Sequence, residues 1–315
     1  MIISSGPLQG ITDDVFRKVH HQIFGGVDRY FGPYIRLEKN KPTKSSQIRD
    51  ISSVLNKEIP FVPQILSNNP DLIIEEIKRQ KLLGNHEINW NLGCPYPMVT
   101  NRKMGSGLLN QPQIIHEILQ KVYSESNIQF SIKCRLGYES ENEIYPLLEV
   151  FNQFDLKEVI IHARTAKQMY KGFANPEKLL SLFKLSKHPI AYNGDINTYD
   201  DFIHIKSIFG DSVKHYMIGR GLISNPNLAF QIKNEGFSEN SQVEKWEQFH
   251  QQLIIQYEKR YQSHQLLPKM RGLWEYLSLG FVDAHQVFKL IKKTKNWSTY
   301  LKNTNTIFHQ FDLNG

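Results

Sequence analysis

Cysteine is scarce in this chain of 315 residues, which has only Cys94 and Cys134. Two thiols forty positions apart make neither a disulfide framework nor the spacing of a zinc site, so we expect a cytoplasmic protein without a structural metal. Long apolar stretches are also missing, since no run approaches the ~20 residues that span a bilayer, and we expect no membrane partner. The first ten residues, MIISSGPLQG, lack a basic segment before a long apolar one, so no secretory signal is expected.

The composition is that of a globular protein with a surplus of basic residues. Hydrophobic residues make up 40% and charged residues 22% of the chain, enough for one large domain or two smaller ones. The net charge of +7 permits attraction to a polyanion such as nucleic acid, although charge alone fits a soluble basic protein equally well. Residues 241–315 hold ten Lys/Arg and six Asp/Glu, so +4 of the surplus lies there. The lysines that cluster in this part are Lys289, Lys292, Lys293 and Lys295.

Short apolar runs rich in β-branched residues recur through the first 220 positions. Helical patterns separate several of them: Asn69 followed by Pro70 predicts a helix start, and apolar residues recur at helical spacing from Ile115 to Val122. Eight strands that alternate with helices over about 230 residues favour a closed (β/α)₈ TIM barrel over a doubly wound open sheet. The runs are Ile2–Leu8, Val27–Ile35, Phe61–Leu66, Glu87–Asn91, Gln129–Cys134, Glu158–His162, Pro189–Asn193 and His215–Gly219.

The pattern changes beyond the eighth run. A polar segment, KNEGFSENSQ, occupies residues 233–242, and apolar residues then recur at helical spacing from Trp246 to Tyr257 while β-type runs disappear. We therefore expect two domains, a TIM barrel over residues 1–235 and a small helical domain over residues 240–315.

Polar and glycine residues gather where the runs end. In a (β/α)₈ barrel the active site lies at the carboxyl ends of the strands, so these residues should share one face. The strings YNGDI and MIGRG end the last two runs, where this fold commonly binds phosphate through glycine N–H groups; two ordinary turns are the alternative. The residues at the run ends are Gln9, Gln64, Asn91, Lys133, Arg135, His162, Arg164, Asn193, Gly194, Asp195, Gly219 and Arg220.

Lys133 and the cysteines carry more specific hypotheses. Lys133 lies within a strand, on the face that it shares with Arg135 and opposite Cys134. Its ammonium is costly to bury unless it meets an anion or an electron-rich ring, and a lysine that reaches solvent is the alternative. Cys134 is typical of core packing. Cys94 follows the fourth run in a Gly-Cys-Pro turn, where it could donate a proton, act as a nucleophile or merely fill the turn.

Together these strings resemble the tRNA-dihydrouridine synthases, flavin enzymes with an FMN-binding (β/α)₈ barrel and a C-terminal helical domain. The similar segments run in order from residue 6 to about 229: GPLQGITDDVFR, NLGCPYPMVTNRKMGSGLL, SIKCRLG, IIHARTAKQMYKG, IAYNGDI and MIGRGLISNPNL. Leu8-Gln9 replaces the usual Met-Glu, Gln or Thr pairing, and the loop YPMVTNRKMGS replaces a version that is rich in lysine in many members. These departures leave the subfamily open.

The resemblance implies a role for each matching residue. Cys94 would be the general acid, and Arg36 would contact the RNA. Asn91 and Arg135 would face the uracil. The remaining residues would line the flavin, bond its ring or hold its ribityl and phosphate groups: Pro7, Leu8, Gln9, Gln64, Lys133, His162, Asn193, Gly194, Asp195, Gly219 and Arg220.

The implied reaction reduces the C5–C6 double bond of a D-loop uridine in tRNA to 5,6-dihydrouridine. NADPH would reduce FMN, the reduced FMN would pass hydride to C6, and Cys94 would protonate C5. We expect a monomer whose basic helical domain binds tRNA and offsets the cost of flipping the base. Two other hypotheses remain open: an FMN barrel that reduces a small molecule, and a catalytically silent RNA-binding barrel.

Overall fold

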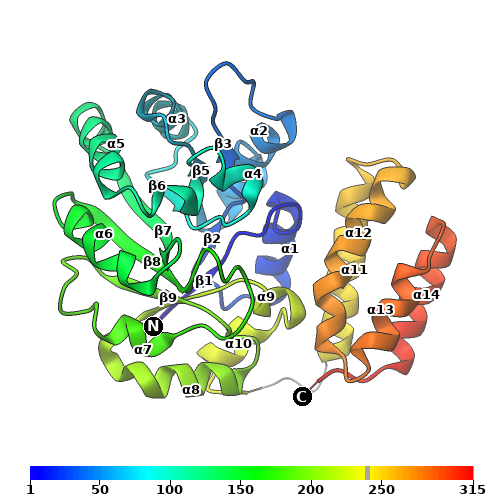
Figure 1. The fold of residues 1–315 in the computed structure, drawn as a ribbon. Coiled ribbons are helices and arrows are strands. Elements are labelled where there is room, and N and C mark those ends of the chain that lie inside the picture. Colours follow the sequence, from blue (N-terminus) through cyan, green and yellow to red (C-terminus); the bar gives the residue numbers. More distant parts are fainter. Residues whose placement is uncertain (238–241, 315) are drawn as a thin grey trace.

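The structure is a computed structural model that describes residues 1–237 and 242–314 (Figure 1). Strands and helices alternate up to α10 (Leu228–Lys233), and the chain is helical from α11 (Gln242–Glu258) onward. The linker predicted at residues 233–242 extends into positions 238–241, which lie outside the described residues, as does part of the expected domain boundary.

The strands of the described chain form one ring. Those strands are β1 (Ile2–Ser5), β2 (Arg29–Phe31), β3 (Ile35–Arg36), β4 (Phe61–Val62), β5 (Gln64–Leu66), β6 (Glu87–Leu92), β7 (Gln129–Gly137), β8 (Leu156–Thr165), β9 (Ile190–Asn193) and β10 (His215–Ile218). They pair in parallel in the order β3-β5-β6-β7-β8-β9-β10-β1-β2-β4.

This order closes because two of the eight predicted runs are each broken once. β2 and β3 are halves of the second run, and β4 and β5 are halves of the third, interrupted at Pro63, which has no N–H to donate to the ladder. β2 pairs with β4 and β3 pairs with β5, so the two end strands of this order, β3 and β4, belong to the second and third runs, which are themselves paired. The predicted (β/α)₈ barrel with a C-terminal helical region is confirmed.

Helices cover the outside of the barrel, and their sequences explain where they begin and what they bury. Asn69 caps α3 by accepting the N–H of Leu72 (3.1 Å), with Pro70 at the first position, as predicted. The apolar stripe from Ile115 to Val122 of α5 is buried against the strands. The helices of the barrel are α1 (Asp14–Ile23), α2 (Ser45–Ile51), α3 (Pro70–Leu82), α4 (Pro97–Thr100), α5 (Pro112–Glu125), α6 (Ile144–Phe151), α7 (Pro176–Leu180), α8 (Tyr199–Phe209), α9 (Gly221–Ser224) and α10.

The interior of the barrel begins with an ionic cluster at the amino ends of the strands. Arg29 pairs with both Glu87 and Glu158, and Glu158 contacts Nδ1 of His215 at 2.5 Å. Burial opposes ionisation of Glu158, but the hydrogen bond and charge of His215 together with Arg29 lower its pKa. A separate apolar layer of Phe31, Val62, Ile160, Ala191 and Met217 fills the barrel. The charged groups of this cluster are thus paired with one another.

The C-terminal helices α11, α12 (Ser263–Leu277), α13 (Ala284–Lys292) and α14 (Trp297–Gln310) form a bundle beside the barrel (Figure 1). Their apolar residues share one core with Val15, Phe16 and Val19 of α1. Both guanidinium nitrogens of Arg260 reach the buried Asp14 at 2.6 Å. The bundle is therefore joined to the barrel through α1.

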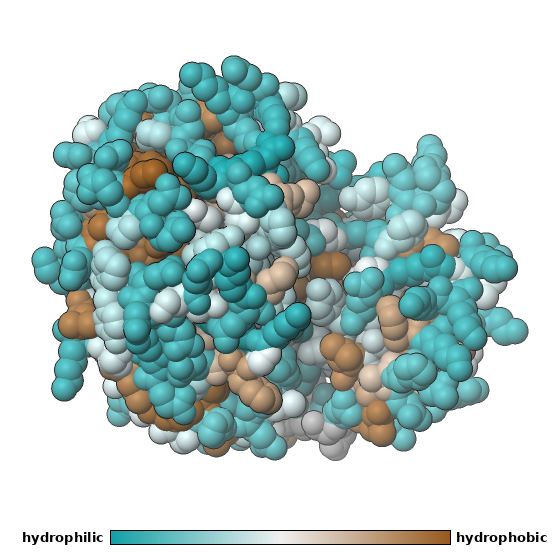
Figure 2. Space-filling view, in the orientation of Figure 1, coloured by the Kyte–Doolittle hydropathy of each residue, from teal (hydrophilic) through white to brown (hydrophobic). Residues whose placement is uncertain are grey.

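Hydrophilic residues dominate the visible face of the molecule, and apolar side chains appear there in small groups (Figure 2). None of the helices in the described residues is long and apolar enough to cross a membrane.

Candidate active site

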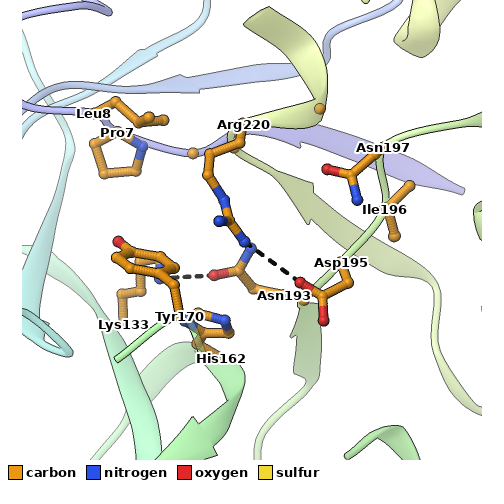
Figure 3. Close-up of a pocket in the computed structure, with 14 residues that line it drawn as sticks. Pro7, Leu8, Lys133, His162, Tyr170, Asn193, Asp195, Ile196, Asn197 and Arg220 are labelled. Carbon is orange, nitrogen blue, oxygen red and sulfur yellow. Dashed lines mark hydrogen bonds and ion pairs between the residues drawn. The ribbon is translucent and has the colours of Figure 1, made fainter. Parts of the chain in front are cut away.

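A cavity of about 530 Å³ opens at the carboxyl ends of the strands and shares several lining residues with a recess of about 90 Å³. Figure 3 shows the residues that line the recess. The structure brings together fourteen of the fifteen predicted site residues along these two spaces. They are Pro7, Leu8, Gln9, Gln64, Asn91, Cys94, Lys133, Arg135, His162, Asn193, Gly194, Asp195, Gly219 and Arg220.

Arg36 is the predicted site residue that does not line either space. It lies half-buried on β3, where its guanidinium donates to the carbonyl oxygen of Met98 (2.9 Å) and pairs with Glu38 (2.9 Å). Met98 belongs to α4 in the loop that follows Cys94. In this structure Arg36 therefore connects β3 to the cysteine loop.

Cys94 lies in the cavity wall with its main chain held on both sides. Its N–H donates to the side-chain oxygen of Asn91 (2.9 Å), and its carbonyl accepts from the N–H (3.1 Å) and hydroxyl (2.9 Å) of Ser106. Gly105 is needed here because its φ is +56° and an added Cβ would lie 2.8 Å from the Cys94 carbonyl oxygen. Cys94 as a whole is 8% exposed, so it is buried while one side faces the cavity.

The hydroxyl of Tyr34 lies 3.8 Å from the Cys94 sulfur. Burial is the main reason that the pKa of Tyr34 is raised, and the neighbouring Cys94 raises it further. A neutral phenol therefore stands beside the thiol.

A chain of buried hydrogen bonds leads from the ionic cluster to Asn91. The Ser131 hydroxyl donates to Glu87 (2.8 Å) and accepts from the Asn89 amide (3.0 Å). The Asn89 oxygen accepts from Gln64 (2.7 Å), whose own oxygen accepts from Asn91 (2.8 Å). At one end of this chain the Glu87 carboxylate can only accept. At the other end the backbone N–H groups of Gly93 and Cys94, which donate to the Asn91 oxygen, can only donate. The two ends therefore fix the orientation of every side-chain amide between them.

Lys133 and Arg135 bring positive charge to the floor of the cavity. The ammonium of Lys133 donates to the amide oxygen of Asn193 (2.8 Å), a neutral partner, and burial, followed by the charge of Arg135, lowers its pKa to about 8. Arg135 donates to the carbonyls of Gly93 (2.9 Å), Thr165 (2.8 Å) and Met169 (2.7 Å) through Nε and one terminal nitrogen. These contacts leave its other terminal nitrogen for Tyr170, which lies beside the guanidinium, and for a ligand.

The recess is built around Asp195. Both terminal nitrogens of Arg164 contact this carboxylate (2.6 and 2.9 Å), and the N–H of Ala174 donates to it (2.9 Å). Arg220 lies 3.4 Å from the same carboxylate (Figure 3). Burial opposes ionisation of Asp195, but the bonds from Arg164 and Ala174 and the two arginine charges lower its pKa. Gly221 allows the chains to approach, because a Cβ there would lie 2.1 Å from the carbonyl oxygen of Ile196.

His162 lies between these groups. Burial, followed by the charges of Arg135 and Lys133, holds its pKa well below the ordinary value. The imidazole is therefore neutral, and its Nε2 accepts from the Arg164 guanidinium (3.2 Å), which leaves the protonated Nδ1 as the donor.

Sequence reasoning missed four tyrosines of the cavity and gave no role to Arg164, the arginine that holds Asp195. Arg164 was expected at the end of its run, and it shares a strand face with His162, two positions earlier. Tyr276 comes from α12, far along the chain, and had no local signal. The missed tyrosines are Tyr34, Tyr96, Tyr170 and Tyr276.

The parallel barrel with its cavity at the carboxyl ends of the strands defines the class of protein, a (β/α)₈-barrel enzyme. Residues 3–311 match the model of the family described as dihydrouridine synthase (Dus). The chain belongs to this family, which confirms the resemblance carried by its motifs, and it is an oxidoreductase.

Curated relatives match nearly the whole chain. The "tRNA-dihydrouridine(16) synthase" of Neisseria meningitidis serogroup B is 26% identical over 304 residues, which cover 92% of this chain and 90% of that protein. The protein of the same name from Pseudomonas putida is 27% identical over 286 residues, covering 87% of this chain and 81% of that protein.

Solved structures resemble the fold at low sequence identity. Histamine dehydrogenase from Rhizobium sp. 4-9 superposes with a TM-score of 0.57 at 10% identity over 74% of this chain and 46% of that one. Morphinone reductase superposes with a TM-score of 0.53 at 10% identity over 78% of this chain and 88% of that one. These likenesses establish the barrel architecture.

Proposed function

We propose that this protein reduces the C5–C6 double bond of a uridine in tRNA and that Cys94 delivers the proton to C5. The observation that carries this proposal is the placement of Cys94, whose thiol faces the same cavity as Asn91 and Arg135. Its main chain is fixed through Asn91 and Ser106, so the sulfur is held in place for proton transfer to a bound base.

The residues present fit FMN as the cofactor. Lys133 carries a half-buried ammonium with only a neutral partner, which suits the electron-rich edge of a flavin ring. Arg220 lines the recess together with the glycines at 194, 219 and 221, and this donor set suits a phosphate. Bound FMN, once reduced by NADPH, would supply the hydride. The residues that would hold it are Pro7, Leu8, Gln9, Gln64, Lys133, His162, Asn193, Gly194, Asp195, Gly219 and Arg220.

The orientation of the Asn91 amide supports recognition of a carbonyl. One N–H of Asn91 is directed to Gln64 by the buried chain, and its second N–H remains for a ligand. Arg135 also retains one terminal nitrogen. Donors from these two residues would bind the carbonyl oxygens of uracil and stabilise charge that develops as the ring is reduced.

The relatives' names support uridine 16 as the target. The charge distribution supports different roles for the two parts of the chain. Residues 1–235 would hold FMN and perform the reduction, and residues 240–315 would bind tRNA through exposed lysines of α13 and the loop after it. Lys289 and Lys292 end α13, and Lys293 and Lys295 follow it, all four exposed.

The decisive experiment supplies FMN and NADPH to the purified protein with tRNA transcribed without modifications, and maps dihydrouridine by position. We expect dihydrouridine at position 16 and none in a matched tRNA with cytidine there. Reduction at another position would refute the assignment to uridine 16. Reduction of free uridine as fast as tRNA would instead favour the small-molecule barrel enzyme, and absence of flavin binding would favour the silent RNA-binding barrel.

A further inference from the structure

The loop after β8 presents an exposed aromatic side chain at the edge of the active site. Phe173 is 89% exposed, although burying a phenylalanine is worth about 1.5–3 kcal/mol. The loop, AKQMYKGFA at residues 166–174, contains two lysines and no acidic residue. Lys167 and Lys171 are both exposed. Lys167 lies 3.5 Å from Glu139, so the apolar ring stands near one lysine that is paired and near Lys171, which is exposed.

The loop is held by the same residues that build the site. Arg135 donates to the carbonyl of Met169 (2.7 Å), and Arg164 donates to the carbonyl of Gly172 (2.7 Å). The N–H of Ala174 donates to Asp195 (2.9 Å). Phe173 therefore lies between two anchored neighbours, and its outward direction is set by the backbone.

The backbone conformation of the loop also indicates that the loop is held in one shape. Met169 has a φ of +50° and Gly172 a φ of +65°. A side chain in the left-handed region costs about 1–3 kcal/mol and persists only where surrounding contacts impose it. At Met169 the imposed contact is the bond from Arg135. Such strained positions recur at ligand clamps, so the loop is a shaped element of the site.

The two aromatic residues of the loop face different surroundings. Tyr170 lines the cavity, with the guanidinium of Arg220 4.6 Å and that of Arg135 5.4 Å from its ring centre. Phe173 is directed into solvent just beyond the recess that contains Asp195. A polynucleotide whose target base enters the cavity must continue past this rim.

We propose that Phe173 is a stacking platform for an unpaired nucleobase of the tRNA next to the base that enters the cavity. This inference rests on the proposed function. Proteins commonly bind unstacked bases with aromatic rings that lie among basic side chains. The base stacks on the ring, and the basic side chains bind the backbone phosphates. The loop has no acidic group that would repel a phosphate. Because the backbone on both sides of Phe173 is anchored, binding orders only its side chain.

The test measures binding of unmodified tRNA to the FMN-loaded protein and to single variants. Stacking on one aromatic ring is worth about 1–3 kcal/mol, so Phe173→Ala should weaken tRNA binding roughly 5- to 150-fold. Phe173→Trp should retain binding, and Phe173→Leu, apolar but without a π face, should lose most of it. Leu82→Ala is the matched control, because Leu82 is also 89% exposed but ends α3 near the amino ends of the strands.

Flavin absorbance and thermal unfolding of each variant report the state of the pocket and the fold. Unchanged tRNA affinity in Phe173→Ala would overturn the proposal, and so would equal affinity of the Phe173→Leu and Phe173→Trp variants. Both results leave the proposed function intact as long as the wild-type protein forms dihydrouridine. Failure of the wild-type protein to act on tRNA would instead refute the proposed function itself.

Discussion

The side-chain oxygen of Asn91 accepts the backbone N–H of Cys94 at 2.9 Å, so the residue that is proposed to bind the base also orients the proposed acid. Asn91 is in turn oriented by Gln64. The proposed binding of the base and the placement of the proposed acid therefore both depend on the Asn91 amide. The position of the thiol thus depends on hydrogen bonds inside the barrel.

Cys94→Ala should separate proton donation from the earlier steps. We expect dihydrouridine formation to fall by about 10²–10⁴-fold, the usual contribution of a positioned acid or base, with FMN binding and reduction by NADPH unchanged. Rapid mixing of the reduced protein with tRNA measures the step. A variant that retained full activity would show that another group supplies the proton.

Ser131→Ala tests the buried chain that orients Asn91. The change leaves Asn89 without an acceptor and Glu87 without one donor, and a buried unsatisfied group costs about 1–3 kcal/mol of unfolding free energy. Urea unfolding checks the value. Ser124→Ala is the control, since Ser124 is exposed on α5 and should change stability little. Equal effects of the two changes would argue against the chain.

Lys133 should make FMN binding sensitive to pH. Its pKa of about 8 lies below the ordinary 10.5, so the ammonium is present below pH 8 and is lost above it. An electron-rich or anionic ligand favours the ammonium, so binding above pH 8 requires uptake of a proton, and Kd should rise up to about tenfold per pH unit. Titration calorimetry in buffers of different ionisation enthalpy measures that proton. Lys133→Met should bind weakly with no such dependence, and a wild-type Kd that stays constant to pH 9.5 would contradict the idea.

Arg260→Ala should destabilise the whole protein. It removes both contacts to Asp14, a carboxylate that is 1% exposed, and breaking such a buried pair costs about 3 kcal/mol. Chemical unfolding followed by tryptophan fluorescence measures the loss. Lys259→Ala removes the same charge from an exposed neighbour and should cost less than about 0.5 kcal/mol. A loss similar to that control would mean that the pair contributes little.

Replacement of Lys292, Lys293 and Lys295 by alanine should weaken tRNA binding and reduce its dependence on salt. Each lysine that contacts a phosphate adds roughly one to the slope of log affinity against log salt. Filter binding across salt concentrations gives both values. The matched triple change at Lys184, Lys206 and Lys214, all exposed on the barrel, alters the net charge equally and should have a smaller effect. If both triple variants behave alike, the tRNA surface lies elsewhere.

The barrel was predictable because its signals are local. Alternation within one strand put Lys133 and Arg135 on one face and Cys134 on the other, and in the structure the first two line the cavity while Cys134 lies in the core. The prediction of eight strand-forming runs was also correct, although the second and third runs are each split into two shorter strands, around Pro33 and Pro63. Strand and helix periodicity is a pattern among residues that are close in the sequence, so it can be recognised without a structure.

The remaining parts of the site depend on contacts between distant segments. Tyr276 reaches the cavity only because α12 packs beside the barrel, and no pattern around residue 276 indicates this. The resemblance assigned Arg36 to the RNA, yet its visible contacts are with Glu38 and Met98. The role of that side chain depends on loop packing that the sequence alone does not specify.

The core shared by α1 and the C-terminal helices determines which pieces of this protein could be exchanged with a relative. If α11–α14 alone were replaced by those of a relative, Val15, Phe16 and Val19 would pack against a different surface. Asp14 would also lose its ion pair with Arg260. The smallest transplantable unit is therefore discontinuous: α1 near the beginning of the chain together with the four helices at its end. Inheritance of RNA preference through this unit would require the two distant segments to change together.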